Sequence, residues 1–335
     1  MTTSFPLLKL PLIPLELIID QLDFLDLLQL SMKSTKLTGI LQLLKLSVGS
    51  LNVCLTERSY EISIQRNFNS SDIVACDSIP VDTITEAVKI QGKPLHIWKH
   101  GRNKMKAKSA QSKLATLETI TMYIMSISKV TNYALNYDDA ETGIRNLFIW
   151  QITTKMDHLN IFSSGDGVTI FPEDLAFILD GISIEFLILK VSCPGFKYQR
   201  PIRHPAIYIK CPNWLDFDQL SFGPETITAN FYDRKVSNAV LNRLIKDWTE
   251  GKNPKLKEVQ FTWEDNDPES LAMAREHETR PPKPIFPNRN IEQLKGLSIN
   301  HRMRHWFIRE SVFYEVRLSV KEDSGLNGIH LEDKP

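Results

Sequence analysis

The sequence predicts an α/β (α+β) protein, with a short helical segment at the N-terminus and a longer domain of alternating strands and helices after it. Apolar residues recur at helical spacing over the first forty-odd residues, and from residue 156 an apolar-x-x-apolar-x-apolar pattern typical of short strands recurs. With 42% hydrophobic and 24% charged residues the composition is that of a globular protein. Its 335 residues leave room for one large or two ordinary domains.

Three short helices are expected at the N-terminus. The first begins at Pro14, because proline suits the first turn of a helix, and its apolar positions are 14, 15, 18, 19 and 22. Asp23 can cap a second helix, and Ser34 or Thr35 a third. The apolar residues of these two helices are Leu27, Leu28 and Leu30, then Leu37, Ile40, Leu41 and Leu44. Helices this short cannot bury so much leucine by themselves, so the surplus apolar surface implies a partner.

This segment, residues 1–46, resembles an F-box. Family positions are matched by Leu10-Pro11, Pro14-Leu15-Glu16, Ile18-Ile19, Leu22 and Asp26-Leu27-Leu28-x-Leu30-Ser31. The opening Phe5-Pro-Leu-Leu-Lys-Leu-Pro11 is typical of nematode F-box proteins. In that family the module docks on the adaptor subunit of SCF ubiquitin ligases, and through it on a cullin scaffold, while the rest of the chain selects a protein substrate. The alternative interpretation is an ordinary amphipathic start to a globular domain.

The resemblance implies a set of residues that contact the adaptor or support the contact. They are Leu8, Leu10, Pro11, Pro14, Leu15, Ile18, Leu27, Leu30 and Ser31. Apolar anchors dominate docking energy when they are buried at the centre of an interface. Some of these leucines must instead form the core of the helical segment, and the sequence does not sort the two groups.

A signal peptide is a further alternative for the N-terminus, because Lys9 precedes an apolar run. Three prolines, Glu16, Asp20 and the lack of a small-residue cleavage site argue against it. No segment approaches the ~18 uninterrupted apolar residues of a membrane span. We therefore expect an intracellular protein, in the cytoplasm, the nucleus or both.

The sequence favours neither catalysis nor a bound metal or cofactor. It contains no Gly-x-Ser-x-Gly, P-loop or His-Glu-x-x-His motif, and in the F-box family ubiquitin transfer is done by other subunits. Cys193, His204 and Cys211 are a candidate metal set, but zinc ligands usually lie closer together, so reduced structural thiols are expected. Residues 163–167 are the most phosphate-loop-like stretch, and a plain turn explains them equally well.

Residues 47–113 are expected to contain linking strands and a basic loop. Alternating runs at residues 51–53 and 60–64 predict the strands. Eight basic residues with little apolar company except Trp98 predict a mobile loop: Lys89, Lys93, Lys99, Arg102, Lys104, Lys106, Lys108 and Lys113. A nucleic-acid-binding patch at residues 99–113 is the alternative interpretation. Forty basic and forty acidic residues give a net charge of zero, which indicates no affinity of the whole protein for nucleic acid.

Residues 114–320 are expected to form a repeat-like α/β domain, followed by a flexible tail at 321–335. The apolar pattern begins at residues 156, 186, 217, 256, 294 and 313. Helical signals lie between these strands at residues 172–180 and from the cap Ser237 to Gly251. This order is typical of a leucine-rich-repeat-like solenoid, in which stacked units lay their strands into a parallel sheet. The asparagine ladder of true leucine-rich repeats is missing.

The same region resembles the F-box associated domain of the type 2 nematode family. The matching residues are Ile209 to Trp214, Leu220, Asn242-x-x-Ile245-x-x-Trp248, Gly251-x-Asn253 and Leu256-x-x-Val259-x-Phe261. Trp248 falls on the buried stripe of its helix and Gly251 where φ turns positive, so we interpret these residues as fold determinants. The two resemblances imply a non-catalytic substrate-recognition subunit of an SCF-type ubiquitin ligase. The alternative is a nucleic-acid-associated protein that uses residues 99–113.

Overall fold

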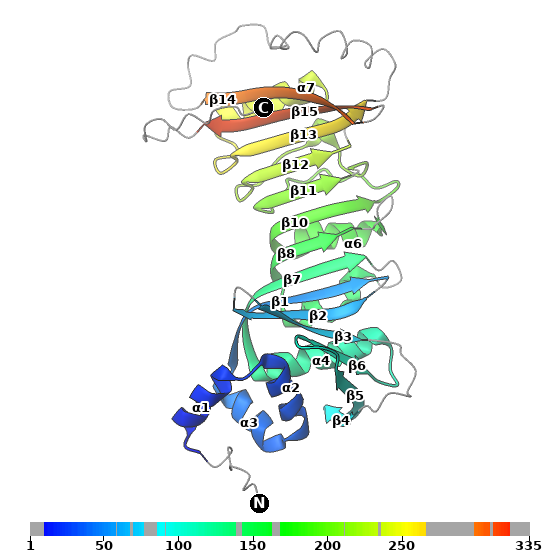
Figure 1. Ribbon diagram of the computed structural model, residues 1–335. Helices are drawn as coiled ribbons and strands as arrows, with labels where there is room; N and C mark the ends of the chain where they lie inside the picture. Colours follow the sequence, from blue (N-terminus) through cyan, green and yellow to red (C-terminus); the bar gives the residue numbers. More distant parts are fainter. Residues whose placement is uncertain are drawn as a thin grey trace, which may run out of the picture. The chain divides into compact units, whose positions relative to one another are not determined.

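The structure is a computed structural model that describes residues 10–57, 59–67, 70–76, 86–90, 92–138, 143–162, 168–210, 212–233, 236–265, 298–308 and 311–321 (Figure 1). The chain divides into two compact units, residues 1–185 (unit 1) and 186–335 (unit 2). Each unit combines helices with parallel and antiparallel strand pairs, so the predicted α/β class is confirmed. Leu8, the 163–167 turn and the tail from residue 322 lie outside the described residues.

Unit 1 begins with three helices, α1 (Leu12–Gln21), α2 (Phe24–Lys33) and α3 (Thr35–Leu44). These are the three predicted helices, although α1 begins two residues before Pro14. Ser34 caps α3 as predicted, because its hydroxyl accepts a hydrogen bond from the Leu37 N–H at 3.3 Å. Asp23 stands at the predicted N-cap position of α2, although its side chain accepts no hydrogen bond from the helix.

A mixed sheet forms most of the rest of unit 1, in the order β8-β7-β1-β2-β3-β6-β5-β4. Its strands are β1 (Leu46–Thr56), β2 (Tyr60–Asn67), β3 (Ser70–Cys76), β4 (Glu86–Ile90), β5 (Lys93–Lys99), β6 (Lys104–Lys108), β7 (Ser128–Asp138) and β8 (Lys155–Ile161). β1 runs parallel to β7, β7 to β8 and β3 to β6, and the other neighbours are antiparallel. The strand predictions at residues 51–53, 60–64 and 156–161 are confirmed.

The predicted mobile loop at residues 89–113 is wrong, because β4, β5 and β6 run through most of it. Leu95 and Ile97 are buried in β5, as are Met105 and Ala107 in β6, while the polar residues between them reach solvent. Each strand therefore has the alternation of a half-buried strand. In β6 each apolar residue stands alone between two lysines, so the alternation typical of a strand is hard to recognise in the sequence.

Helix α4 (Lys113–Ile127) was not predicted. Ser112 caps it, accepting a hydrogen bond from the Ala115 N–H at 3.2 Å. Its buried side chains include Leu117, Ile120 and Ile124. The helix packs against α3 and against strands β2, β3, β4, β6 and β7, so it joins the N-terminal helices to the sheet (Figure 1). The shorter elements of unit 1 are α5 (Ile149–Ile152), β9 (Val168–Thr169) and α6 (Pro172–Ala176), which continues as a π-helical turn at Phe177–Gly181.

Unit 2 contains a sheet in the order β10-β11-β12-β13-β15-β14. The strands are β10 (Ser183–Ser192, which begins at the unit boundary), β11 (Ala206–Lys210), β12 (Thr228–Tyr232), β13 (Glu258–Asp265), β14 (Ser298–Ile308) and β15 (Ser311–Lys321). β10 to β13 are parallel, whereas β15 pairs antiparallel with both β13 and β14. The predicted strands starting at residues 186, 256 and 313 are confirmed, and the parallel arrangement is wrong for the last two strands.

The predicted strand at residues 217–222 is also wrong. Phe217–Gln219 form a 3₁₀ helix, in which the Asp216 carboxylate accepts the Asp218 N–H at 3.2 Å. Phe217 and Leu220, three residues apart, are both buried, and side chains at this spacing lie on one side of a 3₁₀ turn. The apolar pattern alone could not separate the two.

Helix α7 (Asn238–Thr249) follows β12 and fulfils its predictions. The Ser237 hydroxyl accepts the Val240 N–H at 3.3 Å, and Trp248 is buried. Gly251 has a φ of 73°, a conformation that glycine adopts without strain. Burial of Trp248 and the positive φ of Gly251 agree with the interpretation of these two residues as fold determinants.

The packing of α3 is testable with a matched pair of leucines. Leu41 is fully buried, whereas Leu43 on the same helix is 82% exposed. We expect Leu41→Ala to lower the free energy of unfolding by about 2–5 kcal/mol, because it leaves a cavity in the core. Leu43→Ala should change it by less than about 0.5 kcal/mol. Urea denaturation would measure both, and equal effects would contradict this placement of α3.

Candidate protein-docking site

The inner sides of α1, α2 and α3 form an apolar core. Its members are almost completely buried: Leu15, Ile19, Phe24, Leu25, Leu27, Leu28, Met32, Leu37 and Leu41. Each helix has only ten residues, so these side chains make up its whole inward-facing side. What the helices can offer a partner is their outer surface.

The structure separates the predicted docking residues into two groups. Leu15, Leu27 and Ser31 are buried and belong to the support of the helices. Pro11, Pro14 and Leu30 are exposed, and Leu10 and Ile18 are half-exposed. The second group is accessible to a partner, whereas the first can act only by holding the helices in place.

Three exposed apolar side chains were missed by the sequence interpretation. Ile13 is 73%, Leu17 64% and Leu43 82% exposed. Ile13 and Leu17 are four residues apart in α1 and therefore share a helix face, away from the buried Leu15 and Ile19. The signal that could have found them is in the sequence, since they are apolar residues off the inward stripe of a short helix.

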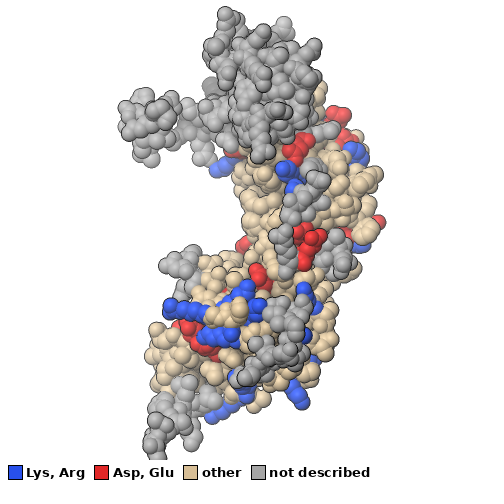
Figure 2. Space-filling view, turned by 45° about the vertical axis from the view of Figure 1, so that its right-hand side comes forward, with Lys and Arg blue, Asp and Glu red and all other residues tan. Residues whose placement is uncertain are grey.

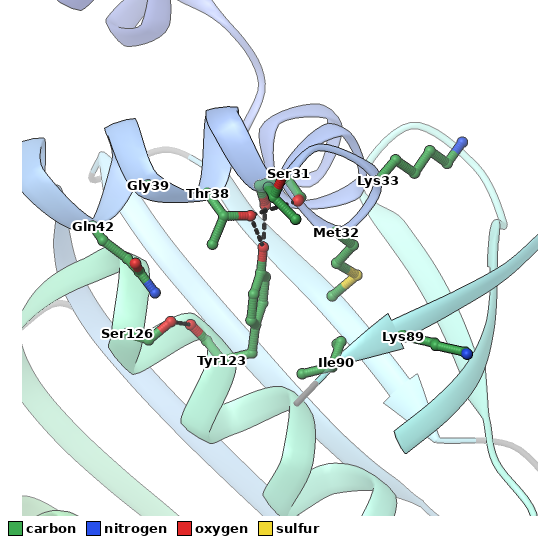
Figure 3. Close-up of a pocket in the computed structure, with 11 residues that line it drawn as sticks. Ser31, Met32, Lys33, Thr38, Gly39, Gln42, Lys89, Ile90, Tyr123 and Ser126 are labelled. Carbon is green, nitrogen blue, oxygen red and sulfur yellow. Dashed lines mark hydrogen bonds between the residues drawn. The ribbon is translucent and has the colours of Figure 1, made fainter. Parts of the chain in front are cut away.

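A cluster of hydroxyl groups joins the N-terminal helices to α4. The Tyr123 hydroxyl donates a hydrogen bond to Ser31 Oγ at 2.9 Å and lies 3.1 Å from Thr38 Oγ1, and Thr38 Oγ1 donates to the Ser31 carbonyl at 2.7 Å (Figure 3). Ser31 Oγ in turn donates to the Leu28 carbonyl at 2.8 Å. Ser31 thus connects α2, α3 and α4, which gives it a structural role.

Ion pairs and side-chain-to-backbone bonds tie the helices to the sheet as well. Lys99 in β5 contacts Asp26 in α2 at 2.7 Å. Arg66 in β2 donates to the Leu22 carbonyl at 3.1 Å and lies 3.5 Å from Asp20. Exposed pairs contribute little individually, but together they fix the position of the helices on the sheet of unit 1.

A cleft of about 490 Å³ lies between α2, α3, α4 and β4 (Figure 3). Its lining includes Ser31, Thr38, Gln42 and Tyr123, with Lys89 on the β4 side. The Tyr123 hydroxyl bonds the hydroxyls of Ser31 and Thr38, and Thr38 also donates to the Ser31 carbonyl, so these bonds link the helices that line the cleft.

One carboxyl beside this junction is electrostatically unfavourable when ionised. Burial, and then the charge of nearby Asp23, raise the pKa of Asp72 in β3 above its usual range, although Arg66 and Lys99 act in the opposite direction. The Asp26 hydrogen bond raises the pKa of Lys99. The junction therefore has one carboxylate that the fold accommodates poorly at neutral pH.

The candidate metal set is not assembled in the described part of the chain. Cys193 and His204 are both buried, and Cys211 lies outside the described residues. Among the described residues, no group of three or more His, Cys, Asp and Glu side chains could hold a metal ion. No helix within the described ranges combines the length and apolarity needed to cross a membrane.

Comparisons with protein-family models, with curated proteins and with solved structures give no match to this chain.

The hydroxyl cluster predicts a measurable contribution of Tyr123. We expect Tyr123→Phe to lower the free energy of unfolding by about 1 kcal/mol, because it removes the hydroxyl that bonds Ser31 and Thr38 in a buried site. Tyr133→Phe is the matched control, since that hydroxyl has only a 4.0 Å contact with the Met125 sulfur. Urea denaturation should show a smaller effect for the control, and the reverse order would refute the role of the cluster.

The raised pKa of Asp72 predicts that Asp72→Asn stabilises the protein at neutral pH. A carboxyl whose folded-state pKa is raised adds stability as pH falls through that pKa, because the folded state binds the proton more tightly. The melting-temperature advantage of the variant should therefore shrink as pH is lowered from 7 toward the ordinary carboxyl pKa of about 3.9. An advantage that grows on acidification would contradict the predicted sign.

Proposed function

We propose that this chain is a non-catalytic substrate-recognition subunit of an SCF-type ubiquitin ligase, a nematode-type F-box protein with a type 2 associated domain. Residues 1–46 would dock on the adaptor subunit, which connects the chain to a cullin scaffold. The rest of the chain would bind a protein substrate inside the cell, in the cytoplasm or the nucleus. The function needs no catalytic residue or cofactor in this chain, because a receptor contributes positioning and effective concentration.

The observation that carries the proposal is the exposed apolar surface of the N-terminal helices. Eight large apolar side chains are exposed in the described part of the chain, and four of them lie in these helices: Ile13, Leu17, Leu30 and Leu43. Apolar side chains concentrated on so short a segment are typical of a protein-docking surface. The three-helix arrangement and the F-box-like sequence of the same segment support an adaptor as the partner.

The proposal includes a leucine-rich-repeat-like arrangement for the C-terminal domain. The parallel strands β10 to β13 and the α7 connection between β12 and β13 support it. The antiparallel β14 and β15 and the 3₁₀ turn at Phe217–Gln219 are departures from a regular repeat. We therefore place substrate binding in the α/β part of the chain without requiring identical repeats.

The test is co-purification with the SCF adaptor subunit. We expect the intact chain to bind, and Ile13→Ser/Leu17→Ser to bind at least tenfold more weakly, because a buried side chain of this size contributes about 1.5–3 kcal/mol. Leu30→Ser, which changes an exposed residue of the predicted set, should also weaken binding. Phe171→Ser/Ile227→Ser removes two exposed apolar side chains from other elements and should leave binding unchanged.

Point variants are better suited to this test than deletion of residues 1–46. The helices cover part of α4, so their removal would leave Tyr123 and its hydroxyl bonds without partners and disturb the rest of unit 1. Circular dichroism of the variants should match that of the intact chain. Absence of adaptor binding by a well-folded intact chain would refute the proposed function.

A further inference from the structure

Strand β4 ends the sheet of unit 1 and, among the described strands, pairs only with β5. Its register places Lys89 opposite Pro94 and Ala87 opposite His96. Because Pro94 has no N–H, Lys89 and Pro94 cannot exchange a pair of backbone hydrogen bonds. Such positions alternate with hydrogen-bonded ones, so Lys89 and Ala87 direct their N–H and C=O groups away from β5. Strand β4 thus offers a short row of backbone donors and acceptors at the sheet edge.

The cleft between α2, α3, α4 and β4 reaches this edge (Figure 3). Both Lys89 and Ile90 line it, although neighbouring side chains of a strand lie on opposite faces, so the cleft meets β4 at its border. Ala87 and Lys89 have no hydrogen bond with described residues outside the sheet. An open edge of this kind is a template for pairing with another chain.

The same cleft is lined by Gly39, which lies in the interior of α3. Glycine in a helix interior lowers stability relative to alanine. A Cβ atom at Gly39 would meet no other atom within 4 Å, and Gly39 is not among the glycines with a positive φ. Neither packing within the protein nor the backbone conformation therefore requires glycine here. What glycine provides is a bare helix surface that another backbone can approach closely.

The described lining of the cleft carries positive charge. It contains Lys33 and Lys89 but no Asp or Glu. Lys33 has an interaction of its own within the protein, whereas the exposed Lys89 has no ion pair with the described residues. Lys and Arg side chains also gather in the lower part of the view in Figure 2, where unit 1 lies. A bound segment with a carboxylate beside Lys89 would therefore be complementary in charge.

We propose that β4 binds an extended segment of a partner protein, which adds to the sheet as a further strand and occupies the cleft. The N–H and C=O groups of Ala87 and Lys89 bond the backbone of the segment, and Lys89 selects an acidic side chain in it. Gly39 lets the segment pass close to α3. The proposal rests on the proposed function only in one respect, namely that the segment belongs to the substrate.

Protection against aggregation is the alternative interpretation of this edge. Proteins block unwanted strand pairing with short edge strands and with lysine, and β4 has both features. Protection accounts for Lys89, but it gives no reason for a glycine in α3 or for a cleft of about 490 Å³ beside the strand. Strand addition accounts for all three.

The test uses fluorescence anisotropy with the full chain and the labelled heptapeptide Ser-Thr-Val-Glu-Val-Thr-Ser. Two further probes carry N-methyl groups, one on both valines and the other on the glutamate and the following threonine. Alternate N–H groups of a strand point to opposite sides, so only one of these probes loses the donors that face β4. We expect binding below about 1 mM and a loss of about tenfold for that probe alone. Equal affinities of the two methylated probes, or no binding at about 1 mM, would overturn the proposal.

Two variants locate the site on β4 and α3. Lys89→Pro removes the edge N–H without breaking a bond to β5 and should weaken binding about tenfold, whereas Lys89→Gln keeps that N–H and should weaken it less. Gly39→Leu should raise the melting temperature and still weaken binding about tenfold, because its side chain fills the cleft. Lys129→Gln, which changes an exposed lysine of β7, is the control and should bind as the intact chain does. Unchanged binding by both Lys89→Pro and Gly39→Leu would refute this location.

This outcome is separable from that of the adaptor test. Peptide binding is measured on the chain alone, and the docking variants Ile13→Ser/Leu17→Ser alter a different element. Absence of peptide binding with adaptor binding intact would refute only the role of β4. Peptide binding without adaptor binding would refute the ligase function and leave a protein that captures extended peptides.

Discussion

The packing of α3 against α4 is the interaction on which the rest of unit 1 depends. Three ten-residue helices have too little volume to enclose their own leucines, so their inner side must be completed by other elements. Helix α4 supplies that cover, and its Tyr123 satisfies the hydroxyls that the contact buries. The same helix covers the sheet, so the N-terminal helices and the strands share one support.

The packing of the helices on α4 leaves two apolar side chains of α1 exposed. Leu15, Leu27 and Leu41 fill the inner side of the helices, whereas Ile13 and Leu17 lie exposed on the outer side of α1. A partner bound to them would be held in a fixed position relative to the sheet of unit 1. In the proposed function, such a fixed connection would set the effective concentration of a bound substrate.

The elements predicted correctly are those whose sequence signal is strong and local. The caps Ser34 and Ser237, the turn at Gly251 and the strands rich in large apolar residues all belong to this group. Helix α4 was not predicted because apolar and threonine side chains occur all around it. Thr116, Thr119 and Thr121 are buried, so the sequence shows no clear amphipathic stripe. The sequence also could not predict which leucines are exposed and which are in the core, because that depends on where α4 lies.

The strands β5 and β6 show how a sequence segment with the composition of a loop can form half-buried strands. Alternation of lysine with Met105 and Ala107 places the apolar residues under α4, and as a consequence the lysines align on the opposite face. A random mixture of the same residues would give a basic surface without period and no buried stripe to hold the strand. The alternation that made residues 89–113 look like a loop is therefore the feature that fixes the spacing of the charges.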